Sequence, residues 1–343
     1  MHELLNVLYV QTQGAYLHLD NDTVRVIIDN ETKLRAPLLR LGGIVVFGQV
    51  SLSPFLVHRC AEDGRSLVWL DRNGRFKARV EGATRGNVLL RRAQHLALSH
   101  QDHPWRIARQ IVAAKIHNSR NVVMRAARES GDVADRAALS QAALTMAGIL
   151  RRLKTTAVMD EIRGAEGEAA RAYFGVFGYM VRQDRQQLSP AGRTRRPPRD
   201  RANALLSFLY ALVRGECASA LEGVGLDPQV GYLHALRPGR PALALDLMEE
   251  LRPVLADRLA VTLINRRQLK PDHFQDAPGG AVNLTDEGRR EVIVAYQNRK
   301  EEEVSHRVLK QRVPLGLVPH VQARLLARHL RGDIKHYPPF LYR

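Results

Sequence analysis

The chain has few cysteines and lacks several common catalytic motifs. Its 343 residues include two cysteines, Cys60 and Cys217, and no C-x-x-C pair, which excludes a zinc ribbon and a thioredoxin-like site. No G-x-x-x-x-G-K-[S/T] sequence is present, so a P-loop ATPase is excluded. The G-x-S-x-G serine elbow and the H-E-x-x-H zinc-protease sequence are also absent.

Long hydrophobic runs are missing as well. No run approaches the roughly 18 apolar residues that a membrane-spanning helix needs. The first residues, MHELLNVLYV, lack the charged and then apolar pattern of a secretory signal. We therefore expect a cytoplasmic protein with reduced thiols and no membrane partner.

Acidic residues are scarce compared with basic ones. The chain has 35 Asp and Glu against 52 Lys and Arg, a net charge of +17 and a pI of about 10.5. A protein this basic usually binds a polyanion, either nucleic acid or an anionic membrane surface. Nucleic acid is favoured because we find no basic amphipathic helix with a Trp-rich apolar face. A simply basic enzyme remains an alternative.

The hydrophobic pattern changes near residue 82. Before it, short runs rich in β-branched and aromatic residues alternate with turn residues, and Asn73-Gly74 is typical of a hairpin. Ser53-Pro54 predicts the start of one helix. After it, apolar residues recur every three or four positions. We predict an α+β two-domain protein, with a small N-terminal β-sheet domain (1–84) followed by a larger all-α-helical catalytic domain (85–343).

Three segments interrupt the helical pattern. The stretch from Ser189 to Asn203 combines three prolines with five arginines and reads as an exposed loop. The stretch PDHFQDAPGGAVNLTDEG is expected to form a loop with a short hairpin before a new helix near Asp286. The final YPPFLYR is expected to be extended and loosely packed.

Glu166 is the first candidate for chemistry. It lies in GAEGEAARAYF between Gly164 and Gly167, where small residues let a ligand approach the backbone closely. The alternative is that Glu166 and Glu168 form an acidic first turn that complements a helix dipole. Spacing alone does not separate these two interpretations.

His234 and a following acidic helix are the second candidate. A helix predicted to begin near Ala242 carries Asp246, Glu249 and Glu250 on one face, three and four residues apart. Such carboxylates repel one another unless a cation offsets them. A solvated acidic face and a structural histidine are the alternatives. One histidine with two or three carboxylates suits Mn²⁺ or Mg²⁺, or Zn²⁺, and such an ion can activate phosphodiester chemistry.

Arginines form the third candidate, a phosphate-binding loop. The planar guanidinium group of arginine can donate two hydrogen bonds to one phosphate group. The alternative is that these arginines belong to an ordinary solvated surface. The predicted DNA-binding residues of this loop are Arg193, Arg195, Arg196, Arg199 and Arg201. A second basic cluster contains Arg85, Arg91, Arg92, Lys115, Arg120 and Arg125.

These segments together resemble the family of CRISPR-associated spacer-acquisition integrases. GAEGEAARAYF is similar to the family's catalytic-glutamate segment, and GLDPQVGYLHALRPGRPALALDLMEELRPVLADR to its histidine and acidic-helix segment. RRPPRDRANALLSFLY, FGQVSLSP and NGRFKARVEG also match the family pattern. The resemblance runs from LNVLYV to YPPFLYR and looks nearest to the I-C branch.

The resemblance implies a metal-dependent DNA endonuclease and integrase. Glu166, His234 and Glu249 would correspond to its catalytic metal ligands, with Asp246 as a supporting group, and the ion would be Mn²⁺ or Mg²⁺. Glu249 stands where other branches have Asp. Family members form homodimers through the β domain and bind a small ferredoxin-like subunit (Cas-two), together with double-stranded and branched DNA.

Two other hypotheses belong to different classes. A non-catalytic nucleic-acid-binding module would use the arginine loop and would not need the acidic helix. A structural scaffold would bear the carboxylates as a solvated face, so that Mn²⁺ would leave its unfolding midpoint unchanged.

Overall fold

The chain divides into two compact units, Met1–Gly86 and Asn87–Arg343. The computed structural model describes residues 6–80, 82, 88–99, 103–190, 192–194 and 197–342. The predicted boundary between residues 84 and 85 falls outside these described residues. A β-sheet unit followed by a mostly helical one confirms the predicted fold class.

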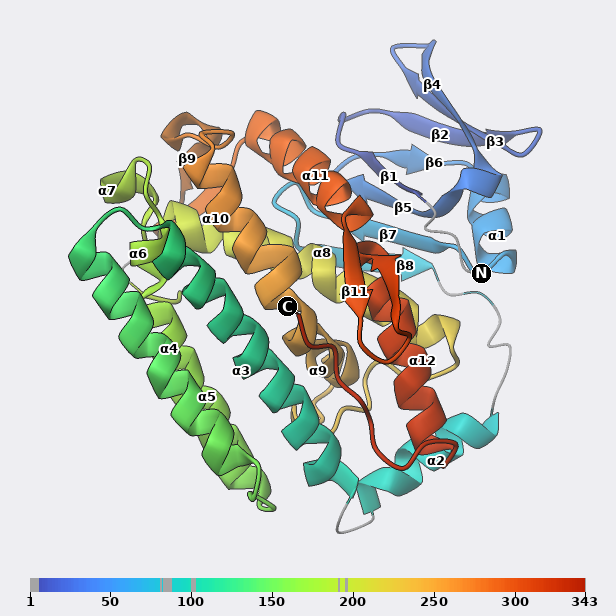
Figure 1. Ribbon diagram of the computed structural model, residues 1–343. Coiled ribbons are helices and arrows are strands. Elements are labelled where there is room, and N and C mark those ends of the chain that lie inside the picture. Colours follow the sequence, from blue (N-terminus) through green and yellow to red (C-terminus); the bar gives the residue numbers. More distant parts are fainter. Residues whose placement is uncertain are drawn as a thin grey trace. The chain divides into compact units, whose positions relative to one another are not determined.

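The first unit contains two four-stranded sheets, ordered β1-β5-β7-β8 and β4-β3-β2-β6 (Figure 1). The strands are β1 (Asn6–Val10), β2 (Tyr16–Asp20), β3 (Thr23–Ile28), β4 (Glu31–Pro37), β5 (Leu41–Phe47), β6 (Ser51–Leu52), β7 (Ser66–Leu70) and β8 (Phe76–Val80). β1, β5 and β7 pair in parallel, and β8 pairs antiparallel with β7. The turn between β7 and β8 contains Gly74 at a φ of 79°, as the hairpin prediction requires.

One helix, α1 (Pro54–Glu62), packs onto these sheets. The hydroxyl oxygen of Ser53 accepts a hydrogen bond from the Leu56 backbone N–H at 3.2 Å, and Pro54 occupies the first helical position. The helix start predicted at Ser53-Pro54 is therefore confirmed. Leu17, Ile44 and Leu56 are fully buried between helix and sheets.

The second unit is built from helices. They are α2 (Val88–Ser99), α3 (His103–Glu129), α4 (Val133–Leu153), α5 (Met159–Gly175), α6 (Phe177–Met180), α7 (Arg185–Leu188), α8 (Arg201–Gly223), α9 (Ala242–Arg252), α10 (Arg258–Asn265), α11 (Asp286–Glu301) and α12 (Val318–Leu330). α9 continues into α10 through a π-helical turn, Pro253–Asp257. The long helices α3, α4 and α5 lie side by side (Figure 1).

The helical unit is not purely helical. Two short hairpins interrupt it: β9 (Phe274–Ala277) with β10 (Ala281–Leu284), and β11 (Glu303–His306) with β12 (Gln311–Pro314). The first of them is the hairpin anticipated in PDHFQDAPGGAVNLTDEG. The second was not predicted, and it corrects the expectation of an all-helical domain.

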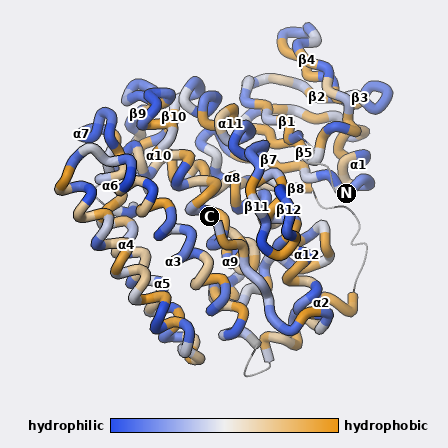
Figure 2. Tube along the Cα trace, viewed as in Figure 1, coloured by the Kyte–Doolittle hydropathy of each residue, from blue (hydrophilic) through white to orange (hydrophobic). Residues whose placement is uncertain are grey.

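Buried stripes of α3 and α8 form much of the core of this unit. Hydrophobic and hydrophilic residues alternate along α3 and α4 (Figure 2), as expected for helices that bury one face. Among the described helices, α8 alone has the length and hydropathy of a membrane span, but most of its apolar window is buried within the protein. It is thus no convincing membrane span.

The segment Tyr337–Tyr342 is extended, but it is not loosely packed as expected. Tyr337 and Phe340 are each 2% exposed. The Asn118 side chain of α3 donates to the Phe340 carbonyl at 3.0 Å and accepts from the Tyr342 N–H at 2.8 Å. Asn121 donates to the Tyr342 carbonyl at 2.6 Å. These bonds fix the segment along α3.

Candidate active site

Glu166 lies two turns inside α5 rather than at its start. The helix begins at Met159, and its acidic first turn consists of Asp160 and Glu161. The helix-dipole interpretation of Glu166 is therefore wrong. Its side chain is 30% exposed, and a Cβ placed at the neighbouring Gly164 would meet no atom within 4 Å. The Glu166 carboxylate is thus half-buried and still reachable from solvent.

His234 lies in the loop that precedes α9, and this loop is fixed at both ends. Arg163, one turn before Glu166 on α5, donates from Nε and Nη2 to the Leu233 carbonyl at 3.3 and 3.2 Å. At Gly231 a Cβ would lie 2.7 Å from the carbonyl carbon of Ala242, so only glycine permits this approach to α9. The loop therefore holds His234 between α5 and α9.

Asp246 of α9 orients that loop by accepting hydrogen bonds from its backbone. Its carboxylate is completely buried and accepts backbone N–H bonds from Tyr232, Leu233 and His234 at 2.6, 3.0 and 3.0 Å. It also lies 2.6 Å from His234 Nδ1. A carboxylate on Nδ1 fixes the ring and leaves Nε2 for another partner. These contacts are consistent with the supporting role predicted for Asp246, which stays a prediction.

Glu249 lies one helical turn after Asp246 and is also buried. Its Oε1 is 3.9 Å from His234 Nε2 and 3.3 Å from Arg252 Nη1, while its Oε2 is 2.7 Å from Lys115 Nζ. Burial alone would raise the pKa of Glu249, but Arg252, Lys115 and His234 together lower it to about 2. The side chain is therefore a carboxylate at neutral pH.

Lys115 of α3 connects Glu249 to Glu166. Its side chain is 5% exposed, and its ammonium group donates to Glu166 Oε1 as well as pairing with Glu249 Oε2. Among the described residues no three His, Cys, Asp or Glu side chains stand close enough together to hold an ion as they are. Glu166, His234 and Glu249 nevertheless converge, with Lys115 between the two glutamates.

The residues present fit a divalent ion. Glu249 Oε2 is a buried acceptor that faces the Lys115 ammonium at 2.7 Å, so it already lies against a cation in the part of the chain that the structure describes. His234 presents Nε2 toward the same carboxylate, because Nδ1 faces Asp246. A buried carboxylate oxygen and an oriented imidazole nitrogen are typical of metal sites.

Glu250 does not join this site, contrary to the expectation that it shares a face with Asp246 and Glu249. It is fully buried and accepts bonds from Tyr337 Oη at 2.6 Å, Phe340 N at 2.7 Å and Gln322 Nε2 at 3.0 Å. Burial raises its pKa to about 8, and these hydrogen bonds limit the rise. Its role is to hold the segment Tyr337–Tyr342.

Arg193, the first residue of the predicted arginine loop, is engaged within the protein. Its guanidinium donates to Asn203 Oδ1 at 2.6 Å and to Ser207 Oγ at 3.3 Å. It also stacks over the Tyr210 ring at 5.3 Å. These bonds anchor the loop to α8.

The remaining loop arginines differ in their surroundings. Arg199 is exposed, and half-buried Arg201 donates to the Gln187 carbonyl at 3.4 Å. Arg195 and Arg196 lie outside the described residues. The structure thus leaves Arg199 as the described loop arginine with the most accessible side chain.

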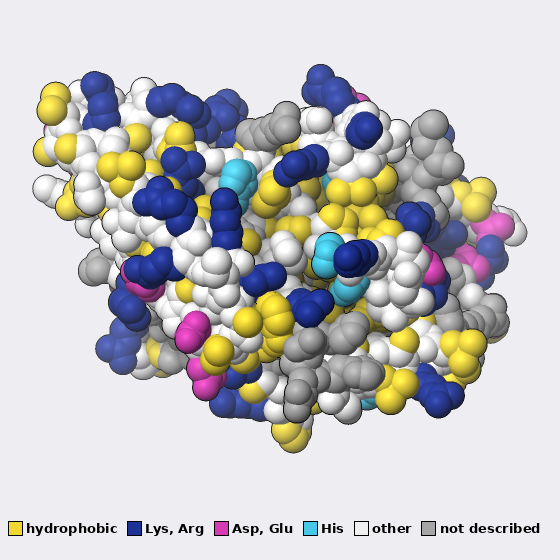
Figure 3. All heavy atoms as spheres, turned by 60° about the horizontal axis from the view of Figure 1, so that its bottom comes forward, with side chains coloured by type: hydrophobic (Ala, Val, Ile, Leu, Met, Phe, Trp, Pro, Cys, Tyr) yellow, Lys and Arg dark blue, Asp and Glu magenta, His cyan; other side chains and the backbone are white. Residues whose placement is uncertain are grey.

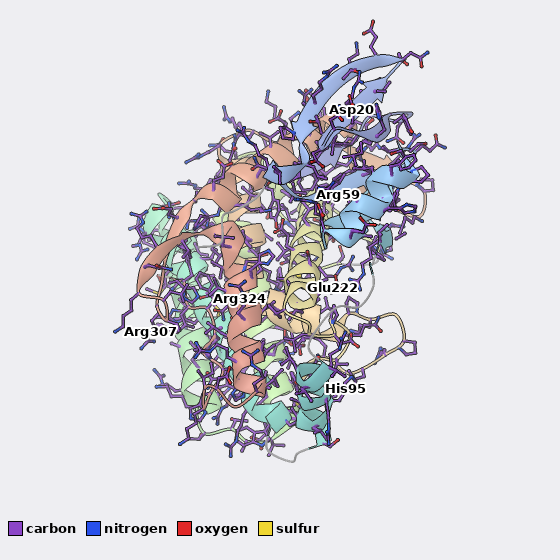
Figure 4. All side chains as sticks on the ribbon, turned by 90° about the vertical axis from the view of Figure 1, so that its right-hand side faces the viewer. Asp20, Arg59, His95, Glu222, Arg307 and Arg324 are labelled. Carbon is purple, nitrogen blue, oxygen red and sulfur yellow. The ribbon has the colours of Figure 1, made fainter. Side chains whose placement is uncertain are left out.

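Basic side chains also cover other surfaces. In Figure 3 Lys and Arg are spread widely over the face shown, whereas Asp and Glu gather at a few places. Figure 4 labels two exposed arginines of the helical unit, Arg324 on α12 and Arg307 between β11 and β12. Of the second basic cluster, Arg85 lies outside the described residues, and Lys115 is buried at the carboxylates rather than on a basic surface.

Lys115 and Arg252 are the residues of this site that the sequence interpretation missed. Lys115 had been grouped with surface cations. A signal was present, because Lys115 follows Ile107 and Ile111 at four-residue spacing and so takes an apolar position of α3. A lysine in a buried stripe requires a nearby counter-charge.

Known proteins match this chain along most of its length. The family model described as CRISPR associated protein Cas1 matches residues 8–298. A relative from Moorella thermoacetica, named CRISPR-associated endonuclease Cas1 1, is 56% identical over 343 residues, which is 100% of both chains.

Two solved structures share the fold. One, titled casposase bound to integration product, has a TM-score of 0.83 and 22% identity, covering 99% of this chain and 95% of that chain. Another, titled Cas6-RT-Cas1--Cas2 complex, has a TM-score of 0.81 and 24% identity, covering 99% of this chain and 36% of that one. At these identities the likeness establishes the fold.

Proposed function

This chain belongs to the Cas1 family of CRISPR-associated proteins, and on that basis we propose that its helical unit carries the active site of a metal-dependent DNA endonuclease and integrase of CRISPR adaptation. The enzyme inserts short DNA fragments (spacers) into the CRISPR array. The observation that carries the proposal is the grouping of Glu166, His234 and Glu249 about the buried Glu249 carboxylate: His234 Nε2 lies 3.9 Å from its Oε1, and Lys115 joins its Oε2 to Glu166.

Glu166, His234 and Glu249 would hold Mn²⁺ or Mg²⁺. Two carboxylates and one imidazole nitrogen are hard and borderline donors of the kind these ions accept. When bound, such an ion polarises the phosphodiester and neutralises the charge that develops in the transition state. Asp246 keeps His234 oriented, and Arg252 keeps Glu249 ionised.

Integration needs no external energy source. A 3′-hydroxyl of the fragment attacks a phosphodiester of the repeat, one P–O bond forms, and one P–O bond to the leaving 3′-oxygen breaks. The number of phosphodiester bonds is unchanged, which agrees with the absence of a P-loop. With water as the nucleophile, the same residues cut DNA.

DNA, a second copy of the chain and a small subunit complete the proposal. We expect the predicted loop arginines to contribute to binding double-stranded and branched DNA, Arg199 through a phosphate contact that its exposed side chain supports and Arg193 by holding the loop on α8. The chain forms a homodimer through its β-sheet unit and binds a ferredoxin-like Cas2 subunit. One structure of the same fold is titled a complex with Cas2, which supports this assembly. The protein acts in the cytoplasm, and its placement in the I-C branch stays a prediction.

A strand-transfer assay tests the function. Purified protein and its small subunit are mixed with a short 3′-hydroxyl duplex and a supercoiled plasmid that carries a leader and repeat, in Mn²⁺, Mg²⁺ or EDTA. His234→Ala is compared with His95→Ala, because His95 is an exposed histidine of α2 (Figure 4). We expect joined product that requires metal and that only His234→Ala loses.

Two outcomes would contradict the proposal. Tight duplex binding without joining or cutting in any metal would make the chain a non-catalytic nucleic-acid-binding module. Full activity of Glu249→Ala would refute the ligand assignment. Metal binding is measured separately as a rise in the free energy of unfolding, about 2.7 kcal/mol at an ion concentration of 100 times Kd. A scaffold with solvated carboxylates would give no rise.

A further inference from the structure

Lys115 is the one described lysine whose ammonium group lies between two of the proposed ligands. It is 2.7 Å from Glu249 Oε2 and donates to Glu166 Oε1. Its position is set by α3, because Asn118, one turn later, donates to the Glu250 carbonyl of α9 at 2.7 Å. The same contact that fixes α3 against α9 therefore places Lys115 at Glu249.

Neutralising Glu249 does not by itself require Lys115. Arg252 already pairs with Glu249 Oε1 at 3.3 Å, and its side chain is 7% exposed. An arginine makes this contact through a planar fork, whereas lysine carries a compact charge on a flexible stem. Lys115 can therefore move away from the space between Glu166 and Glu249 without leaving the site.

The net charge of the site also favours a catalytic role for Lys115. Three buried or half-buried carboxylates face two cations, which leaves one net negative charge when the imidazole is neutral. A divalent ion changes this to one net positive charge, which matches the single charge of a phosphodiester. The five groups are Glu166, Asp246, Glu249, Lys115 and Arg252. Without Lys115 the phosphodiester would lack a full counter-charge just where its transition state gains more negative charge.

We propose that Lys115 is a catalytic residue whose ammonium group contacts a nonbridging oxygen of the scissile phosphodiester, acting as a second cation beside the ion. The ligand class is a DNA phosphate, which approaches from the side where Glu166 and His234 are 30% and 21% exposed. This inference rests on the metal site proposed above. Before DNA binds, the same ammonium holds the two glutamates together.

Three variants test this role: Lys115→Met, which is unbranched and uncharged, Lys115→Gln, which is shorter, polar and uncharged, and Lys154→Met as a control at an exposed lysine. Mn²⁺ affinity is measured by calorimetry without DNA, duplex affinity by fluorescence anisotropy, and the strand-cleavage rate in single turnover at saturating Mn²⁺. We expect Lys115→Met and Lys115→Gln to bind Mn²⁺ at least as tightly as the wild type, because a like charge has been removed. Their single-turnover rate should fall about 100-fold or more, as for loss of one transition-state contact.

The outcomes separate the interpretations. A cleavage rate within threefold of wild type at saturating Mn²⁺ would overturn the proposal. Lys115 would then only pair with the two glutamates while no ion is bound. Weaker Mn²⁺ binding, with a rate that is slow at low Mn²⁺ and returns to the wild-type value at saturating Mn²⁺, would also overturn it, because Lys115 would then act by shaping the ligands. A wild type that binds no Mn²⁺ refutes the metal site itself. If Lys115→Met does not fold, Lys115→Gln gives the same comparison.

Discussion

Asp246→Asn should uncouple the histidine loop from α9 while leaving the overall fold in place. In the wild type, Oδ2 accepts from Tyr232 N and Leu233 N, while Oδ1 accepts from His234 N and lies against Nδ1. An amide keeps one acceptor oxygen, so its NH₂ group faces the Tyr232 and Leu233 N–H donors in one orientation, and the His234 N–H and ring Nδ1 in the other. Each buried donor left without an acceptor costs about 1–3 kcal/mol, and we expect the free energy of unfolding to fall by about 3 kcal/mol.

Urea denaturation followed by circular dichroism measures this loss, and strand cleavage in Mn²⁺ measures the functional effect. Misorienting a ligand histidine typically costs about 10–100-fold in metal affinity or activity. Asp276→Asn is the matched control, because Asp276 is an exposed aspartate of β9. If Asp246→Asn kept wild-type stability and wild-type cleavage, the role assigned to this carboxylate would be refuted.

Three further predictions concern other parts of the molecule. Tyr337→Phe removes the hydroxyl that donates to Glu250 at 2.6 Å, so urea denaturation should show a loss of about 1–3 kcal/mol; an unchanged midpoint would contradict the role of this bond. Burial raises the pKa of Cys60 to about 11 and that of Cys217 well above its usual value, so at pH 8 both thiols are protonated. Ellman's reagent should label neither thiol in the folded protein and both in guanidinium; rapid native labelling would count against this. Arg199→Ala should reduce the slope of log affinity for duplex against log salt by about 0.9 while metal binding is unchanged, and an unaltered slope would exclude a phosphate contact.

The fold was predictable wherever one local signal was strong. Three local features were predicted because each depends only on residues that are neighbours in the chain. They are the helix start at Ser53-Pro54, the turn at Asn73-Gly74 and the helix start near Ala242, and the structure has all three. The strand β4, sequence ETKLRAP, does not belong to the runs rich in β-branched and aromatic residues from which we predict strands, because most of its residues are exposed and several are charged. β6 has only two residues and exists through its pairing with β2.

The site was predictable to the level of residue types and spacing. Family resemblance supplied the roles of Glu166, His234 and Glu249, and helical periodicity placed Asp246 on the same helix as Glu249. Periodicity also predicted that Glu250 lies at the site with Asp246 and Glu249, and this was wrong. Neighbouring residues on one helix face can contact different parts of the protein. Only the segment Tyr337–Tyr342, far away in sequence, determines that Glu250 points to a different neighbour.

The contacts of Asn118 have a consequence for the order of folding. This side chain joins partners 132 and 222 positions away in the chain, and closing such long loops is slow compared with forming helices. Helices α3, α5 and α9 can each form early, but their acidic and basic groups meet only when these distant closures are complete. An incompletely folded chain therefore carries every residue of the candidate site before these side chains can act together.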